Sequence, residues 1–470
     1  MSAKVSVILP SLNMAAYIRE CLDSVVNQSL QELEIICIDA GSTDGTTEIL
    51  EEYAGRDSRI VLLHSEIKSY GRQVNMGLDH AGGKYVAILE TDDWIERDMY
   101  QCLYAIAEEN RLDYVAADFD TFISLQNGCN YFTRQHIFPD VEQRNMGQDE
   151  GGMFPIPAHD WYEQVLGPDR IAVLRSTDYV LWKGIYSRKF LIENGIRLHE
   201  SPGAAFQDMG FLQQVKSYAK RAVYIDKSFY RYRQGREEAS SGCAEGLRYY
   251  EGEFRWLNEQ QTFISSLKGG HRNYYYFTMS IAFLTKYEQI LSSLHGEWKD
   301  DRLEGPYEWF QRQISNAVDE GLLEEGMYGE ELWERLKLLL TSREVHARRV
   351  VDKEKTQKRT AQAFFCMIEN RPVVIFGCGI RGERLMLFCD RNQIGIDAFC
   401  DNRVELHGKK KFGFPVISPT ELAQMAGDRN QVVLLSMKEG AVQVRNQLIA
   451  LGIEESRVIE KLPAGIIYTA

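Results

Sequence analysis

The sequence predicts an α/β protein in three parts: a mixed, mostly parallel sheet domain over residues 1–240, a helical region over 241–368, and a small α/β domain over 369–470. In the first part, apolar runs alternate with amphipathic segments, which implies βαβ units with right-handed crossovers. The middle part is rich in Glu, Lys, Arg, Leu and aromatic residues and has few prolines, which favours packed helices. A new strand–helix alternation begins at Val373, and about a hundred residues suffice for a separate domain.

Hydrophobic periodicity predicts the individual elements of the first part. Short apolar runs predict buried strands, and apolar residues three and four positions apart predict amphipathic helices. The predicted strands are 5–9, 34–38, 60–63, 85–89 and 114–117, and the predicted helices are 13–27, 46–53, 72–80, 97–110, 179–192 and 208–219. Between 127 and 178 the periodicity is lost, which predicts a functional loop or a surface cover that contributes to specificity.

Two segments of the helical region have an ordinary structural interpretation. The aromatic run Tyr274–Phe277 has helical spacing and predicts the core of a helix bundle, not a ligand site. The stretch Arg343–Arg359 is dense in charges of both signs and predicts a solvated helix face.

The composition, 44% hydrophobic and 26% charged, is that of a soluble globular protein. A net charge of −14 argues against a general nucleic-acid binder. Nine cysteines without a CxxC pair indicate reduced thiols and predict a cytoplasmic protein. No apolar run approaches the length of a membrane span, and the N-terminus enters a strand with no room for a signal peptide. Peripheral contact with the inner membrane face and a homo-oligomeric state both stay open.

Polar groups follow three strands of the predicted first sheet. They are Pro10–Asn13 after the first strand, Asp39–Gly45 after the second, and Glu90–Asp93 after the fourth. Each loop alone is explained as a turn or a helix cap. Because the carboxyl ends of parallel strands meet at one edge, the three loops together predict one ligand crevice. Paired carboxylates there can hold a divalent cation against a diphosphate, so the segment Glu90–Asp93 predicts a nucleotide-sugar site.

These segments resemble the inverting glycosyltransferases of family 2, which have the GT-A fold. The chain reads Val-Ile-Leu-Pro10-Ser-Leu-Asn13, then Ile-Asp39-Ala-Gly-Ser-Thr-Asp-Gly-Thr46, then Leu-Glu90-Thr-Asp92-Asp93-Trp94. The resemblance covers about residues 3 to 240. It implies a GT-A fold for this part, with a Rossmann-like, mostly parallel sheet.

The resemblance also implies roles for single residues around the donor. Asp39 would hydrogen-bond the uracil ring, and Pro10 and Ser11 would line the uridine pocket. Asp92 would lie near the ribose and phosphates, and Asp93 would bind Mn²⁺ or Mg²⁺. The chain departs from the family pattern where Ala40 replaces a second acidic residue and where Glu90 occupies a position that is often Asp; we expect Glu90 not to contact the metal directly.

The general base is expected farther along the chain. The segment Ser201–Asp208 and the later run Tyr230–Gln234 resemble a bacterial subgroup that reads Pro-Gly-Ala, an aromatic, Gln-Asp, and then Tyr-Arg-Tyr-Arg-Gln. The resemblance therefore implies that Asp208 is the catalytic base. Guanidinium groups suit diphosphate oxygens, and the candidates for donor binding are Arg72, Arg231 and Arg233.

The implied activity is a metal-dependent, inverting transfer of a hexosyl group from a nucleoside-diphosphate sugar, with UDP-sugar as the first candidate. The acceptor would be a hydroxyl of a glycan or of a lipid-linked molecule, in bacterial surface polysaccharide synthesis. Two alternatives stay open, a nucleotidyltransferase and a non-catalytic sugar-nucleotide sensor. The first usually has a Gly-rich basic loop after the first strand, and Pro10–Ala15 contains neither Gly nor Lys.

The last part contains the pattern Gly377-Cys378-Gly379-Ile380-Arg381-Gly382 after a predicted strand, with Asp401 at the end of the next strand. This spacing matches the dinucleotide-binding fingerprint, in which glycines approach a pyrophosphate and the acid contacts a ribose. The segment resembles Rossmann-like modules attached to bacterial sugar-modifying enzymes. It predicts nucleotide binding through Gly377, Gly379, Gly382 and Asp401, and a structural or oligomerising module is an equal alternative.

Overall fold

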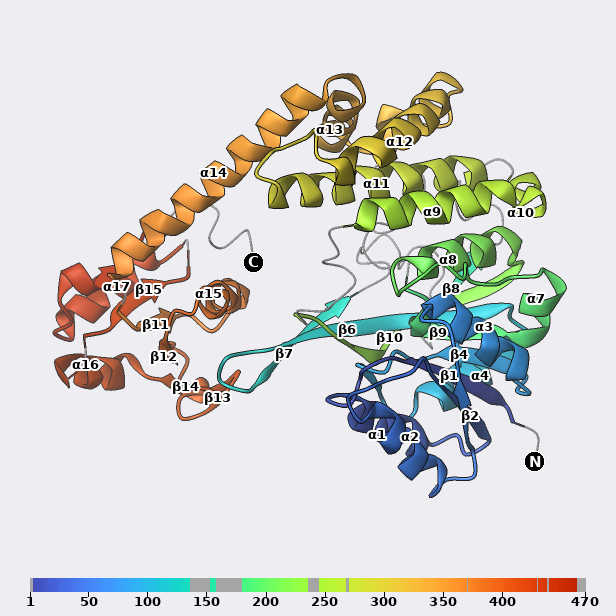
Figure 1. Ribbon diagram of the computed structural model, residues 1–470. Helices are drawn as coiled ribbons and strands as arrows, with labels where there is room; N and C mark the ends of the chain where they lie inside the picture. Colours follow the sequence, from blue (N-terminus) through green and yellow to red (C-terminus); the bar gives the residue numbers. More distant parts are fainter. Residues whose placement is uncertain are drawn as a thin grey trace. The chain divides into compact units, whose positions relative to one another are not determined.

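The computed structural model describes residues 3–135, 153–157, 180–235, 245–267, 270–369, 371–428, 430–437 and 439–462 (Figure 1). The chain divides into two compact units. Unit 1 comprises Met1–Phe122 and Phe132–Ala347, and unit 2 comprises Ile123–Tyr131 and Arg348–Ala470. Among the described residues, no helix is long and apolar enough to cross a membrane. The predicted domain boundaries at 240 and 368 stay predictions.

Unit 1 is built on one mixed sheet. Its central order is β3-β2-β1-β4-β9-β6-β10-β5, with β7 paired to β6 and β8 paired to β10. The pairs β1·β2, β2·β3, β1·β4 and β6·β10 are parallel. The strands are β1 Val5–Ser11, β2 Leu33–Asp39, β3 Ile60–His64, β4 Tyr85–Ile88, β5 Trp94–Ile95, β6 Tyr114–Ser124, β7 Asn130–Gln135, β8 Met153–Pro157, β9 Gly184–Ser187 and β10 Arg221–Arg233. The predicted fold class, a mostly parallel α/β sheet, is confirmed.

Helices connect the parallel strands and place their carboxyl ends at one edge. They are α1 Ile18–Val26, α2 Thr46–Ala54, α3 Tyr70–His80, α4 Met99–Asn110, α7 Arg188–Glu193 and α8 Gln207–Tyr218. The register pairs Ser11 at the end of β1 with Asp39 at the end of β2. β4 pairs with β1 on its other side, so the segment that follows Ile88 emerges at the same edge. The three polar loops predicted from the sequence therefore follow neighbouring strands.

The predicted helix 179–192 is wrong in its middle. A short 3₁₀ helix, η2 Leu181–Lys183, leads into β9, and only Arg188–Glu193 is α-helical. β9 lies between β4 and β6 and runs antiparallel to both. Gly184 permits this position, because a Cβ there would lie 2.0 Å from the carbonyl oxygen of Val115. A short apolar run does not by itself distinguish a buried strand from a buried helix.

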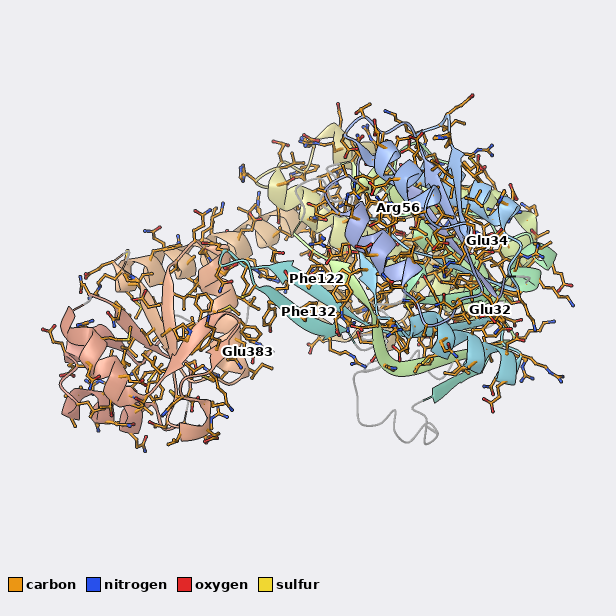
Figure 2. The ribbon with its side chains drawn as sticks, turned by 90° about the horizontal axis from the view of Figure 1, so that it is seen from below. Glu32, Glu34, Arg56, Phe122, Phe132 and Glu383 are labelled. Carbon is orange, nitrogen blue, oxygen red and sulfur yellow. The ribbon has the colours of Figure 1, made fainter. Side chains whose placement is uncertain are left out.

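The irregular stretch predicted for 127–178 is wrong where the structure describes it, since β7 and β8 lie within it, and the rest lies outside the described residues. Among the described residues β7 pairs with β6 alone, and most of its residues are exposed, so it lacks the apolar run that predicts a buried strand. At the base of this hairpin, the rings of Phe122 and Phe132 lie 5.4 Å apart (Figure 2). Both rings contact Trp94, with centroids 6.4 Å and 6.5 Å away.

The predicted helical region is confirmed. Its helices are α9 Gly246–Glu259, α10 Gln261–Ser266, α11 Gly270–Ser293, α12 Asp301–Asp319, α13 Glu330–Thr341 and α14 Arg343–Ile368. Tyr274, Tyr275 and Phe277 are buried, as expected for the core of a bundle. Within unit 1, α9 packs against α8, the helix that carries Asp208 (Figure 1). The helical region is thus in contact with the elements around the predicted base.

Unit 2 contains the second, smaller sheet, with the order β13-β14-β12-β11-β15-β16. Its elements are β11 Val373–Phe376, α15 Ile380–Arg391, β12 Ile396–Cys400, β13 Lys410–Lys411, β14 Phe414–Ile417, α16 Pro419–Asp428, β15 Val432–Leu435, α17 Ala441–Ala450 and β16 Val458–Ile459. All neighbouring strands are parallel except β13 and β14. Alternate residues of β11 enter two different apolar clusters, so both faces of the sheet are covered.

The tip of the β6–β7 hairpin is part of the core of unit 2. Leu125 is 3% exposed within the apolar cluster of unit 2, and Tyr131 packs against the same cluster. Gln126 donates from its backbone N–H and from its amide to Asp390, at 3.0 and 2.6 Å. Unit 2 therefore combines a C-terminal α/β sequence with a segment that lies more than two hundred residues earlier in the chain.

Candidate active site

The acidic segment after β4 is attached to β10 through Asp93. β5 follows this segment directly and pairs antiparallel with β10, with Trp94 opposite Arg231. Asp93 is 1% exposed, and its two carboxylate oxygens accept from the Tyr230 hydroxyl at 2.9 Å and from the Arg233 backbone N–H at 2.7 Å. Loss of hydration, followed by the charge of Asp92, raises the pKa of Asp93 well above its usual value. In this arrangement Asp93 holds the acidic segment in place.

Glu90 and Asp92, the neighbours of Asp93, are partly exposed. The Tyr70 hydroxyl donates to Glu90 Oε1 at 2.5 Å, and Arg233 Nε donates to the backbone carbonyl of Asp92 at 3.0 Å. The acidic segment thus presents two carboxylates at the edge of the sheet and keeps a third in the interior.

The ends of β1 and β2 form a second side of the crevice. Asp39 is 2% exposed and accepts from groups of its own loop, among them the Ser42 hydroxyl at 2.5 Å and the Thr47 hydroxyl at 2.9 Å. The Ser11 hydroxyl is buried and has no hydrogen-bond partner among the described residues. The carbonyl of Pro10 accepts from the Thr91 hydroxyl at 3.0 Å, which ties this loop to the acidic segment. An unpartnered buried hydroxyl beside Asp39 is a group that a polar ligand can satisfy.

Asp208 lies in the first turn of α8 and is partly exposed. Loss of hydration is the main cause that raises its pKa to about 7, and the charge of Glu253 adds to the rise. The residue before α8 is Phe206, whose φ of 67° lies in the left-handed region. A non-glycine residue is rare in this conformation and persists where its surroundings hold it.

Two tyrosines connect Asp208 electrostatically with the acidic segment. The pKa of Tyr70 is raised by burial, then by Glu90, and also by Asp208. The pKa of Tyr232 is raised by burial and by the carboxylates of the acidic segment and of Asp208. Both phenols therefore lie within electrostatic reach of both parts of the site. Asp208 and the acidic segment thus share two electrostatic neighbours, Tyr70 and Tyr232.

Sequence reasoning missed Tyr70, Tyr232 and Trp182 as site residues. Trp182 stacks on Tyr230 with ring centroids 3.9 Å apart and on Tyr232 with centroids 5.2 Å apart. The run Tyr230–Gln234 carried a signal, because two tyrosines two positions apart in a strand point to the same face. Trp182 lies in a segment predicted as helix, so its contact with β10 could not be anticipated.

The three arginines differ in their surroundings. Arg233 is tied to the acidic segment and pairs with Glu20 at 2.6 Å. Arg72 lies 3.5 Å from Glu200 with its side chain 41% exposed, so it can reorient. Arg231 forms ion pairs with two carboxylates outside the acidic segment, Glu96 at 2.7 Å and Asp120 at 3.2 Å. Their roles in phosphate binding stay predictions.

The carboxylates fit a metal only together with a ligand. Among the described residues, no three His, Cys, Asp or Glu side chains are arranged to hold a metal ion. Mg²⁺ commonly takes one or two carboxylates and completes its octahedron with substrate phosphates and water. Glu90 and Asp92 supply two partly exposed carboxylates of this kind. The donor set therefore fits a cation bound jointly with a diphosphate.

The fingerprint of unit 2 has the backbone geometry that its glycines predict. Gly377 has a φ of 108°, and a Cβ on Gly382 would lie 2.0 Å from the carbonyl oxygen of Gly377. Asp401 accepts from the Cys378 backbone N–H at 2.8 Å and from the side chain of Arg403 at 3.0 Å. Partial burial opposes ionisation of Asp401, but these hydrogen bonds prevail and lower its pKa. The carboxylate is thus occupied within unit 2, and nucleotide binding through Gly377, Gly379, Gly382 and Asp401 stays a prediction.

Residues 6–157 match the model of the family described as Glycosyl transferase family 2, and residues 369–459 match the model described as C2185-like, N-terminal. Glycosyltransferase GlyA of Streptococcus pneumoniae is 28% identical over 240 residues, which cover 49% of this chain and 30% of GlyA. The uncharacterized glycosyltransferase YibD of Escherichia coli is 32% identical over 229 residues, which cover 49% of this chain and 61% of YibD. The chain thus spans only part of the length of both relatives.

A similarity to solved structures is also present. S. aureus TarS 1–349 in complex with UDP matches with a TM-score of 0.46 and 18% identity, and the match covers 75% of this chain and 92% of that chain.

Proposed function

The chain carries a family 2 glycosyltransferase domain, and from this premise we propose that it is a metal-dependent, inverting glycosyltransferase. The donor is a nucleoside-diphosphate sugar, with a UDP-sugar as the first candidate. The acceptor is a hydroxyl of a glycan or of a lipid-linked molecule, in bacterial surface polysaccharide synthesis.

One observation carries this proposal. The ends of β1, β2 and β4 bring Ser11, Asp39 and the acidic segment to one edge of the sheet. The charge of Asp208, from α8, raises the pKa of Tyr70 and Tyr232, and so do charges of the acidic segment. A nucleotide pocket, a cation position and a separate carboxylate are the three elements that an inverting transfer needs.

Asp92 would hold the cation, with Glu90 close by in the same segment. Asp93, the ligand predicted from the sequence, would have to give up a hydrogen bond from Tyr230 or Arg233 to reach it. When bound, Mn²⁺ or Mg²⁺ would act as a Lewis acid on the diphosphate oxygens of the leaving group. Ser11 and Asp39 orient the nucleoside, and Arg233 keeps the carbonyl of Asp92 in place.

Asp208 accepts the proton of the attacking hydroxyl. A base is most effective when its pKa lies near the working pH, because it is then ionised and still binds a proton well. The pKa of Asp208, raised to about 7, meets this condition. Attack from the face opposite the leaving diphosphate inverts the anomeric centre.

The test is a panel of UDP-, GDP- and CDP-sugars incubated with the full chain and Mn²⁺ or Mg²⁺. We expect release of the nucleoside diphosphate from one nucleotide class, and loss of that release when EDTA removes the metal. Pyrophosphate release from a nucleoside triphosphate and a sugar phosphate would instead indicate a nucleotidyltransferase. Tight binding of a sugar nucleotide without any turnover would indicate a sensor.

A further inference from the structure

Helix α9 places a buried carboxylate, Glu253, beside the loop that precedes Asp208. Glu253 is 1% exposed. Its Oε1 pairs with His199 Nδ1 at 2.8 Å and accepts from the Ser201 hydroxyl at 3.4 Å. Its Oε2 is buried and has no hydrogen-bond partner among the described residues. A buried carboxylate with one unsatisfied oxygen is costly, so its presence here calls for an explanation.

Glu253 lies against the first turns of α8. Gly210, two residues after Asp208, faces it, and a Cβ on Gly210 would lie 2.6 Å from Glu253 Oε2. The missing side chain therefore lets the carboxylate approach the N-terminal end of α8. Partial positive charge at a helix N-terminus favours a carboxylate at this place.

A chain of hydrogen bonds runs from Glu253 to the residues just before Asp208. The Ser201 hydroxyl accepts from Gln207 Nε2 at 2.9 Å, and Gln207 Oε1 accepts from the Ala205 backbone N–H at 2.8 Å. Phe206, in its left-handed conformation, stacks on Tyr250 of α9 with ring centroids 4.0 Å apart. The helical region thus fixes the backbone that presents Asp208.

We propose that Glu253 is a positioning residue for Asp208: it fixes the loop 201–207 and places a negative charge against the first turns of α8. The proposal rests on the role of Asp208 given above. It gives the helical region a part in catalysis, because α8 carries the base and α9, from the helical region, sets the surroundings of that base.

The titratable groups that interact with Asp208 come from three elements: Tyr70 from α3, Tyr232 from β10 and Glu253 from α9. Lys286 from α11 lies beside the preceding loop, with its Nζ 5.3 Å from the centroid of the Phe206 ring. Of these, Glu253 is the one whose charge raises the pKa of Asp208. Removing that charge should therefore lower the pH at which Asp208 ionises.

The experiment replaces Glu253 with glutamine and uses two readouts. The first is the acid limb of kcat/KM against pH for sugar transfer, which we expect to move down by about one pH unit. The second readout needs no activity. It is the difference in unfolding midpoint between each chain and its Asp208→Asn derivative, measured at a series of pH values. The highest pH at which this difference still changes reports the ionisation of Asp208 in the folded protein, and we expect it to fall together with the pH of the acid limb.

Three variants make the result decisive. Glu253→Asp keeps the charge and should keep the limb near its original pH. Glu251→Gln removes a charge from the same helix, where Glu251 pairs with Arg255, and should leave both readouts unchanged. Gly210→Ala displaces Glu253 Oε2 and should lower the pH of both readouts by less than Glu253→Gln does. This variant also tests the proposal if Glu253→Gln fails to fold.

The outcomes separate the two proposals. Unchanged readouts in a folded Glu253→Gln chain, or in Gly210→Ala if Glu253→Gln does not fold, overturn the role of Glu253. The stability readout can also shift while kcat/KM for sugar transfer shows no acid limb at the corresponding pH. This result supports the Glu253–Asp208 coupling and overturns the assignment of Asp208 as the base.

Discussion

At the scale of single residues, the position of Asp208 decides the chemistry. The substitution Asp208→Asn keeps the shape of the side chain and removes its ability to accept a proton. Loss of a general base usually lowers the rate by about 10²–10⁴-fold. We expect kcat to fall within this range while the affinity for the nucleoside diphosphate, measured by calorimetry, stays within about twofold. Near-normal turnover in this variant would remove Asp208 from the role.

The raised pKa of Asp208 also predicts a dependence of stability on pH. Its pKa is about 3.9 in an unfolded chain and about 7 in the folded protein, so protonated Asp208 favours the folded state. Its contribution is fully present below about pH 4 and is lost as the pH rises through 7. Relative to Asp208→Asn, the protein should therefore lose up to about 4 kcal/mol of unfolding free energy across this window, and partial exposure will reduce the loss. Urea titrations at several pH values measure it; parallel curves for the two proteins would contradict it.

At the scale of elements, β9 shows how a single glycine admits a strand. Gly184 lies where a Cβ would meet the carbonyl oxygen of Val115 at 2.0 Å, so the neighbouring strand blocks any side chain. We expect Gly184→Ala to lower the free energy of unfolding by about 1–3 kcal/mol, as overpacking does in other cores. The urea midpoint at constant m-value measures this loss.

The matched control is Gly305→Ala in α12. Gly305 is exposed in a helix, and a Cβ there has no neighbour within 4 Å. Alanine favours a helix over glycine by about 1 kcal/mol, so this variant should be as stable as the original or more stable. Equal destabilisation by both substitutions would show that close packing around β9 is not the cause.

Among the elements, those with strong local signals were predicted and those defined by their partners were not. The strands β1, β2 and β4 follow largely apolar runs, because both of their faces are covered. β9 and β7 carry no such signal, since β9 is a short run that reads equally as helix and β7 is largely exposed. The place of β9 in the sheet depends on β4 and β6, which lie far away in the sequence. β7 pairs with β6, its neighbour in the chain.

At the scale of the whole molecule, unit 2 depends on a segment from the first part of the chain. Leu125, at the tip of the β6–β7 hairpin, is 3% exposed in the apolar cluster of unit 2. Leu→Ala in a core costs about 2–5 kcal/mol, so we expect Leu125→Ala to destabilise unit 2 by this amount. Hydrogen exchange should speed up at the amides of β11 and β15 and stay unchanged at β1.

Leu451→Ala, directly after α17, is the matched control, because Leu451 belongs to the same unit and is 39% exposed. It should leave the exchange of β11 and β15 nearly unchanged. An effect of Leu125→Ala no larger than that of Leu451→Ala would mean that the hairpin tip covers unit 2 without supporting its core.

The sequence by itself determined the α/β class, the helical middle region and the polar loops at three strand ends. These features depend on local periodicity and on residue types that lie close together in the chain, so a single sequence records them. Asp39, Asp92 and Asp93 lie in those loops, whereas Asp208 was a candidate only through the resemblance to a known family; the roles of all four stay predictions.

Only the tertiary structure decided which of these carboxylates are exposed and what surrounds them. It buried Asp93 against β10, left Asp92 partly exposed, and packed Glu253 from the helical region near Asp208. It also placed Leu125 in the core of unit 2. The physical reason is the same in each case: hydration, proton affinity and packing depend on contacts between residues far apart in the chain, and local patterns do not encode those contacts.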